Sequence, residues 1–228
     1  EGRVIAFGGR VMGQEEPKYL NSPESPVYVK GRHLYGLNRS KEFIRKEGYA
    51  ILVEGYFDFL ALWNAGVHPV VASLGTALTK EQVALLRRYT QKVYITFDSD
   101  EAGRKALARS LELFLSADVD AWAVSLPHGC DPDSYIREYG KGGFLDILQE
   151  AQPIETYFLE RVLSRETTVV GEKNAVNEAI HLSNSIADPL SRNLFLRRVS
   201  ERFGVDYDIL KRRGQGGRAN AVSADAGP

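Results

Sequence analysis

Apolar residues gather in four short runs between residues 49 and 127, and each of the first three is followed by a stretch with helical spacing. The runs lie in YAILVEG, PVVASLG, KVYITF and VDAWAVSLP, and the helical stretches between them are YFDFLALWNAG, TKEQVALLRRY and EAGRKALARSLELFL. Short continuous apolar runs are typical of strands buried on both faces of a sheet. The alternation therefore predicts an α/β fold with a mostly parallel sheet flanked by helices.

Polar residues predict where several of these helices begin and end. Thr79 and Gln82 have the spacing of a capping box, and Gly66 is placed to end the first helix. Asp131 followed by Pro132 fits an N-cap and the first helical position. After Gly129 the stretches DPDSYIREYG and FLDILQEA predict two short helices.

The two ends of the chain differ from this central pattern. Residues 1–38 are rich in Gly, Pro, Asn and Ser, and RVIAF and RVM on either side of GG predict a β-hairpin or tight strand pair. From Pro153 to Arg213 only helical spacing occurs, with breaks at Gly171, Asp188-Pro189 and Gly204. We expect four parts: a basic β/loop segment (1–38), the α/β domain (39–140), an all-helical subdomain (141–213) and a disordered tail (214–228).

Length and composition fit a folded protein with a real core. The chain has 228 residues, of which 43% are hydrophobic and 26% charged. No apolar run approaches the roughly 20 residues that cross a bilayer, and no secretory leader is visible, so we expect a soluble, cytoplasmic protein without membrane contact. Cys130 is the single cysteine, so we expect no disulfide and no cysteine-based zinc site in this chain.

Charge is unevenly distributed although the net charge is only −1. Residues 1–50 carry nine Lys/Arg and six Asp/Glu, whereas residues 51–150 carry nine and fourteen. A basic arm beside an acidic centre would place phosphates next to metal-binding carboxylates. Differences of this size are also common on ordinary surfaces.

Acidic residues follow three of the predicted strands. Glu54 closes the first run, Asp98 and Asp100 close KVYITF, and Asp131 and Asp133 follow the fourth run. In a parallel sheet these positions meet at the carboxyl-end edge, where ligands bind. Mg²⁺ prefers carboxylate oxygen and water, and clustered carboxylates leave coordination positions open for phosphates.

Each acid also has a structural explanation. Asp100 and Asp131 fit helix N-caps, and Asp58 lies within a predicted helix where it needs no partner but water. Taken singly, each aspartate favours the structural role. The combination of a Glu-Gly strand end, an Asp-x-Asp strand end and a further Asp-x-Asp favours a metal site.

Several motifs together resemble a known family. VEGYFDFLAL and TFDSDEAGRKA resemble the Toprim fold that primases, topoisomerases and some nucleases share. FGGRV, PKYLNSPES, KGRHLYGL, VEGYFDFLAL, ASLGTALT, FDSDEAGRKA and DPDSYIREYG occur in the order found in bacterial (DnaG-type) DNA primases, over about residues 3 to 140. PKYLNSPE is the most specific of them, since topoisomerases and nucleases of this fold lack it.

The resemblance implies the RNA polymerase core of a primase, which makes short RNA primers on single-stranded DNA by metal-dependent nucleotidyl transfer. By matching position it implies that Glu54, Asp98 and Asp100 are catalytic and bind Mg²⁺ or Mn²⁺, with Asp58, Asp131 and Asp133 completing the acidic site. It also implies a patch for nucleoside triphosphate and the template–primer backbone, made by Arg10, Lys18, Asn21 and Lys30. Without the motifs, a solvated loop charge is the simpler explanation of Arg10, Lys18 and Lys30.

Whole primases have further parts that this chain does not match, namely a zinc-binding domain, a segment ahead of FGGRV and a helicase-binding domain. We therefore expect a monomeric core fragment, inactive alone if those parts are needed, with the replicative helicase as a partner of the whole protein. The alternatives are a topoisomerase or nuclease on the same fold, or a replication scaffold acting through the helical part. No tyrosine here stands in a nucleophile motif.

Overall fold

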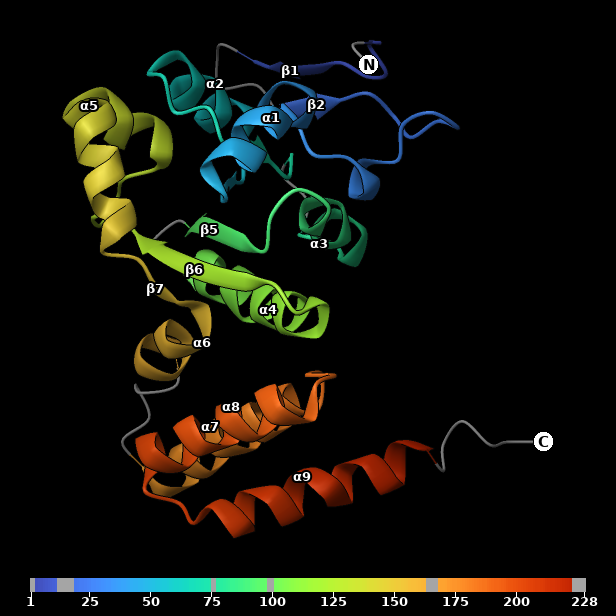
Figure 1. Ribbon diagram of the computed structural model, residues 1–228, viewed down its shortest axis with the longest axis vertical. Coiled ribbons are helices and arrows are strands. Elements are labelled where there is room, and N and C mark those ends of the chain that lie inside the picture. The colour runs from blue at the N-terminus through green and yellow to red at the C-terminus, as the bar shows by residue number, and fades with distance from the viewer. Residues whose placement is uncertain (1–2, 12–18, 75–76, 98–100, 163–167, 223–228) are drawn as a thin grey trace.

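The computed structural model describes residues 3–11, 19–74, 77–97, 101–162 and 168–222 (Figure 1). Its centre is a five-stranded sheet with the strand order β4-β3-β5-β6-β7. The four strands predicted from the apolar runs are all present and parallel, and a short fifth strand pairs antiparallel with β6. The strands are β3 (Ala50–Val53), β4 (Val70–Ala72), β5 (Lys92–Phe97), β6 (Asp120–Ser125) and β7 (Gln152–Pro153).

Helices cover both faces of this sheet, as the continuous apolar runs predict. In β3, Ala50 and Leu52 belong to the core on one face, whereas Ile51 and Val53 belong to the core on the other. The helices of the first face are α1 (Leu37–Glu47), α3 (Lys80–Arg87), α4 (Glu101–Ala117) and α6 (Ile154–Tyr157), and those of the second are α2 (Tyr56–Asn64) and α5 (Pro132–Gln149). A strand with no polar face must be buried on both sides.

Helix boundaries largely follow the predicted signals. Thr79 and Gln82 form the capping box of α3, and Gly66, with a φ of 86°, follows the end of α2. The two helices expected after Gly129 are the two halves of α5, separated at Gly140, whose φ of 67° breaks the helical backbone. Glycine takes this conformation without the steric cost that a side chain would add.

The pairing in the basic segment differs from the prediction. The expected hairpin of RVIAF with RVM is wrong, because Gly8 and Gly9 lie inside a strand rather than in a turn. That strand, β1 (Gly8–Arg10), pairs antiparallel with β2 (Tyr19–Asn21). A Cβ on Gly8 would lie 3.0 Å from Asn21 Oδ1 and 3.4 Å from Tyr56 Cε1, so close packing explains the glycine.

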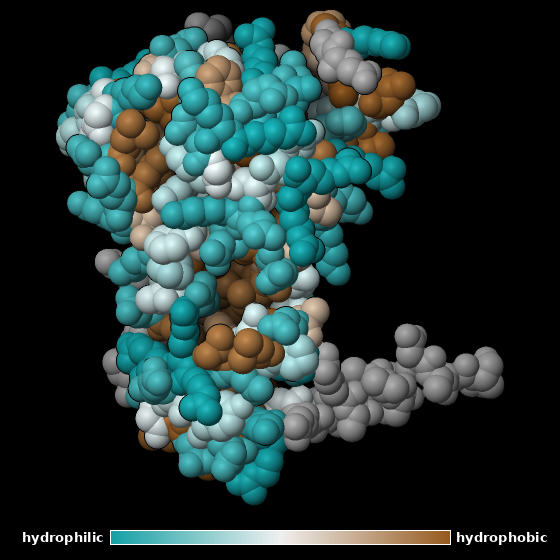
Figure 2. All heavy atoms as spheres, in the orientation of Figure 1, coloured by the Kyte–Doolittle hydropathy of each residue, from teal (hydrophilic) through white to brown (hydrophobic). Residues whose placement is uncertain are grey.

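Exposed apolar side chains gather on this same segment. Val4, Phe7, Leu20 and Val27 are each between 65% and 77% exposed. Figure 2 shows apolar surface at the end of the molecule where the N-terminal segment lies, with further apolar areas elsewhere on the face. Apolar patches of this kind are typical of contacts with another domain or chain.

The helical part lies at the far end of the molecule from β1 and β2 (Figure 1). It consists of the π-helical turn η2 (Phe158–Val162) and of α7 (Val169–Ser183), α8 (Pro189–Phe203) and α9 (Tyr207–Val222). Its core is continuous with the first face of the sheet, since Phe114 of α4, Phe158 and Val199 belong to one buried cluster. An ion pair between Arg198 and Glu155 also joins α8 to α6.

Two sequence expectations for this part need correction. Asp188-Pro189 and Gly204 do end or begin helices, but Gly171 lies in the first turn of α7, which Thr168 caps. The tail expected to be disordered from Gly214 is helical to Val222, and residues 223–228 lie outside the described part. A Cβ on Gly214 would lie 3.8 Å from Ile180 and from Asn184, so this part of α9 lies against the α7 region.

No helix in the described part of the chain is long and apolar enough to span a membrane.

Gly36, which caps the start of α1, provides a test of this packing. Its φ is 79°, and a Cβ there would lie 2.0 Å from Phe59 Cε2. Gly48, with a φ of 77° and no atom within 4 Å of its Cβ position, is the matched control. We expect Gly48→Ala to lower the free energy of unfolding by about 1 to 2 kcal/mol, from backbone strain alone. Gly36→Ala should cost a further ~1 to 3 kcal/mol from overpacking against Phe59, as measured by urea denaturation. Equal losses in the two variants would contradict the packing of α1 against α2.

Candidate functional site at the carboxyl ends of β3 and β5

The topology of the sheet marks one edge as the place for a ligand. The chain passes from β3 to β4 on one side and then crosses back over β3 to reach β5 on the other. α2, which follows β3, and α4, which follows β5, therefore cover opposite faces. The carboxyl ends of strands at such a reversal of strand order, here β3 and β5, are the usual ligand position in open α/β sheets. We call this the acidic edge, after Glu54 and the acids predicted around it.

Glu54 lies at this edge directly after β3, and its side chain is exposed. Its backbone is fixed by the segment that follows β4: Ser73 N–H donates to Val53 O at 3.1 Å, and Leu74 N–H donates to Glu54 O at 3.0 Å. Leu74 makes this bond with a φ of 67°. A left-handed backbone costs a leucine about 1 to 3 kcal/mol, and such strain concentrates at functional sites. Leu74 is therefore part of the site's framework, and no sequence signal distinguishes it.

Asp58 supports the turn between Glu54 and α2. It occupies the third position of α2, and its Oδ2 accepts a hydrogen bond from Gly55 N–H at 3.1 Å. A Cβ on Gly55 would lie 2.9 Å from that oxygen, so the close approach requires a glycine. Asp58 is partly buried, and the expectation of a merely solvated helix residue does not hold.

Asp98 and Asp100 lie outside the described residues. β5 is described to Phe97, the residue before Asp98, and it pairs directly with β3. Their assignment as metal ligands stays a prediction. Among the residues that the structure describes, no three acids, histidines or cysteines come close enough to hold a metal ion.

Asp131 and Asp133 have partners within their own helix. Asp131 is the N-cap of α5, and its Oδ1 accepts a hydrogen bond from Ser134 N–H at 2.7 Å. Partial burial raises the pKa of Asp131, but the hydrogen bonds from Ser134 outweigh it and leave the pKa below its usual value. Asp133 accepts two hydrogen bonds from Arg137, at 2.7 and 3.0 Å. The N-cap prediction for Asp131 is confirmed, and a metal role for either acid stays a prediction.

The basic segment packs on the turn that follows Glu54. The guanidinium carbon of Arg10 lies 5.2 Å from the centre of the Phe57 ring, a cation–π distance. Gly8 pairs with Asn21, and a Cβ on Gly8 would lie close to both Asn21 and Tyr56. Arg10 and Asn21 are thereby placed beside the first residues of α2, whereas Lys18 lies outside the described residues.

Lys30 is the first residue of η1 (Lys30–Arg32), and η1 packs against α3. Its side chain is partly buried, and its backbone N–H donates to Glu24 Oε1 at 3.3 Å. The structure thus places Arg10 beside the first residues of α2 and Lys30 beside the start of α3. Hard carboxylate oxygens beside phosphate-binding cations fit a divalent metal ion and a nucleotide better than any soft-metal or redox group.

Comparisons with known proteins agree with this geometry. A family described as Toprim-like matches residues 51–136, and the family of the DNA primase catalytic core, N-terminal domain, matches residues 1–41. The chain is 55% identical over 141 residues to the DNA primase of Aquifex aeolicus, covering 61% of this chain and 28% of that protein. The chain spans about a third of the length of most of the curated primases that it matches.

Solved structures match over most of the chain. A DNA primase domain from Pseudomonas aeruginosa is 37% identical with a TM-score of 0.85, and the match covers 94% of this chain and 68% of that one. A DnaG primase catalytic domain bound to single-stranded DNA is 34% identical with a TM-score of 0.80, covering 91% and 67%. The chain therefore belongs to the DnaG-type family of bacterial DNA primases.

Proposed function

We propose that this chain is the metal-binding part of a DNA-directed RNA polymerase that makes short RNA primers on single-stranded DNA. The observation that carries the proposal is the packing of β1 against the start of α2, where Gly8 lies close to Tyr56 and Arg10 lies over the Phe57 ring, just after Glu54. This packing supports a site in which cationic side chains for phosphates lie beside carboxylates for a metal ion. Because the chain spans about a third of its curated relatives, the activity belongs to the longer protein.

The proposed partners follow from the same arrangement. A related catalytic domain is described as bound to single-stranded DNA, which supports a DNA template here. Ribonucleoside triphosphates and the growing primer carry the phosphates that Arg10, Lys18, Asn21 and Lys30 would contact without reading sequence. We further propose a monomer that meets the replicative helicase through other parts of the whole protein. The rival topoisomerase or nuclease is not favoured, since the relatives are named DNA primases.

Glu54, Asp98 and Asp100 would hold the metal ion, Mg²⁺ or Mn²⁺, with Asp58, Asp131 and Asp133 around them. A bound divalent ion supplies charge neutralisation at the phosphates and lowers the pKa of a bound hydroxyl. Asp58 keeps the Glu54 turn in place through Gly55 N–H. One oxygen of Asp131 is committed to Ser134 N–H, and its other oxygen is available to a ligand.

The reaction is a nucleotidyl transfer. The 3′-hydroxyl oxygen of one ribonucleotide forms a bond to the α-phosphorus of the next triphosphate, the hydroxyl loses its proton, and the α–β phosphoanhydride bond breaks to release pyrophosphate. Little covalent chemistry falls to the protein, so its task is to position the two substrates and offset their charge. Arg10 and Lys30 offset phosphate charge, and the fixed backbone at Glu54 keeps the carboxylates in register with them.

The acidic residues provide the first test. In the full-length protein, Asp98→Ala and Asp100→Ala should each abolish primer synthesis, because the metal loses a ligand and the phosphates lose its charge. Asp146→Ala, at an exposed position of α5, is the matched control and should retain activity. Incorporation of labelled ribonucleotide gives the activity, and circular dichroism checks the fold. Near-normal synthesis by either site variant would refute the assignment.

Lys30 provides a second test. Lys30→Ala should raise the KM for nucleoside triphosphate on the order of tenfold, since a hydrogen bond to a charged group contributes roughly 1.5 to 3 kcal/mol. The rise should shrink with added salt, because salt already weakens the phosphate contact in the parent protein. Lys46→Ala, at the exposed end of α1, should leave KM unchanged. A KM for Lys30→Ala equal to that of the control would remove Lys30 from the nucleotide site.

A further inference from the structure

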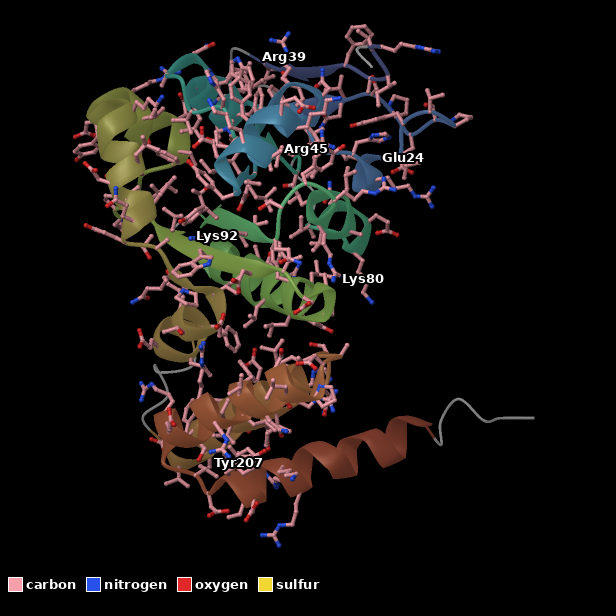
Figure 3. All side chains as sticks on the ribbon, viewed as in Figure 1. Glu24, Arg39, Arg45, Lys80, Lys92 and Tyr207 are labelled. Atoms are coloured by element: carbon pink, nitrogen blue, oxygen red, sulfur yellow. The ribbon has the colours of Figure 1, made fainter. Side chains whose placement is uncertain are left out.

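Two side chains at the start of α3 bind the backbone of the basic segment. Thr79 Oγ1 donates to Gly31 O at 2.5 Å, and Gln82 Nε2 donates to His33 O at 2.8 Å and to Lys30 O at 3.4 Å. Residues 30–33 therefore present three carbonyls to two residues about fifty positions away. In Figure 3, Lys80 marks the start of α3, on the same side of the molecule as Glu24 of the basic segment.

The same two side chains also cap α3, and every hydrogen that they can donate has an acceptor. Thr79 Oγ1 accepts from Gln82 N–H at 3.2 Å, and Gln82 Oε1 accepts from Thr79 N–H at 3.1 Å. Gln82 is completely buried, so both hydrogens of its amide need acceptors. The carbonyls of Lys30 and His33 supply them, which also fixes which way the amide group points.

This contact is linked to the acidic edge through the chain between β4 and α3. Ser73 and Leu74 bind the backbone at Val53 and Glu54, and Thr79 follows five residues after Leu74. On the other side, Tyr35 exchanges two backbone hydrogen bonds with Ala72, the last residue of β4, at 2.9 and 3.1 Å. The segment from Lys30 to Tyr35 is thus hydrogen-bonded both to the end of β4, at Ala72, and to the start of α3, at Thr79 and Gln82.

We infer that Thr79 and Gln82 are positioning residues, which hold Lys30 at a fixed place relative to Glu54. This inference rests on the proposed function, in which Lys30 contacts the nucleotide. Loss of the contact would free η1 to move and would weaken nucleotide binding without touching the metal ligands. A capping box alone predicts only a loss of helix stability.

Gln82→Glu separates the two roles. Glutamate keeps an oxygen for Thr79 N–H, as in an ordinary capping box, but it has no hydrogens for the carbonyls of Lys30 and His33. Thr79→Val removes the donor to Gly31, and Thr79→Ser restores it, so this pair gives an independent variant should the buried glutamate prevent folding. Thr168→Val is the matched control, because Thr168 caps α7 through Gly171 N–H far from the basic segment.

The experiment measures primer synthesis by the full-length variants together with amide hydrogen exchange. Arg32 N–H and His33 N–H close η1 by bonds to Val29 O and Lys30 O, so their exchange rates report its opening. We expect Gln82→Glu and Thr79→Val to speed this exchange at least tenfold and to raise the KM for nucleoside triphosphate several-fold, with kcat little changed. Thr79→Ser should restore both values, and Thr168→Val should change neither.

A double-mutant cycle closes the test. If Gln82 acts through Lys30, Gln82→Glu should raise KM in the parent protein but add nothing in the Lys30→Ala protein. Additive effects, unchanged exchange at Arg32 and His33, or an unchanged KM would each overturn the inference. Normal synthesis by Asp98→Ala would instead refute the proposed function, and the coupling between Gln82 and Lys30 would still be measurable.

Discussion

The hydrogen bonding of β3 between β4 and β5 is the constraint on which the rest of the molecule depends. It makes β3 an interior strand, so all four of its residues are buried and both faces need helices. It also sets the crossing over β3, and with it the reversal of strand order at the acidic edge. The bonds from Ser73 and Leu74 extend the β3–β4 pairing past the strand ends and fix the backbone of Glu54. Core and candidate site therefore share one set of backbone contacts.

Much of this was predictable because the signals are local. A run such as AILV has no polar face, so burial on both sides follows from the run itself. Thr79 with Gln82 and Asp131 with Pro132 act within one helical turn, and their spacing alone identifies the helix starts. The position of Glu54 at a strand end required only the strand and its direction. The assignment of Asp98 and Asp100 came from the motif, and it remains a prediction.

The features that could not be predicted depend on contacts between distant residues. Gly8 and Gly9 look like a turn in the sequence, yet both lie in β1, which pairs with β2, and Asn21 and Tyr56 leave little room for a side chain at Gly8. α9 continues through a polar, glycine-containing stretch that no local pattern marks as a helix, and at Gly214 it lies close to α7. The second task of Gln82 is equally invisible, since a capping box shows nothing of the carbonyls at Lys30 and His33. A sequence pattern shows how a residue interacts with its neighbours in the chain. It does not show which distant residues the same side chain contacts in the folded protein.

Whether an aspartate can both cap a helix and bind a metal ion depends on how many of its carboxylate acceptor positions the cap uses. A carboxylate has two oxygens and about four acceptor positions, so one hydrogen bond does not exhaust it. The Oδ1 of Asp131 accepts a hydrogen bond from Ser134 N–H. This bond helps to keep the pKa of Asp131 low, so the carboxyl group stays ionised and attracts a cation. Asp133 differs, because Arg137 engages both of its oxygens. The Arg137 side chain is 74% exposed and that of Asp133 is 22% exposed, so a metal ion that bound Asp133 would have to displace a partly buried ion pair. Capping and metal binding are therefore compatible in Asp131, whose cap orients the carboxylate, whereas metal binding by Asp133 would require Arg137 to move.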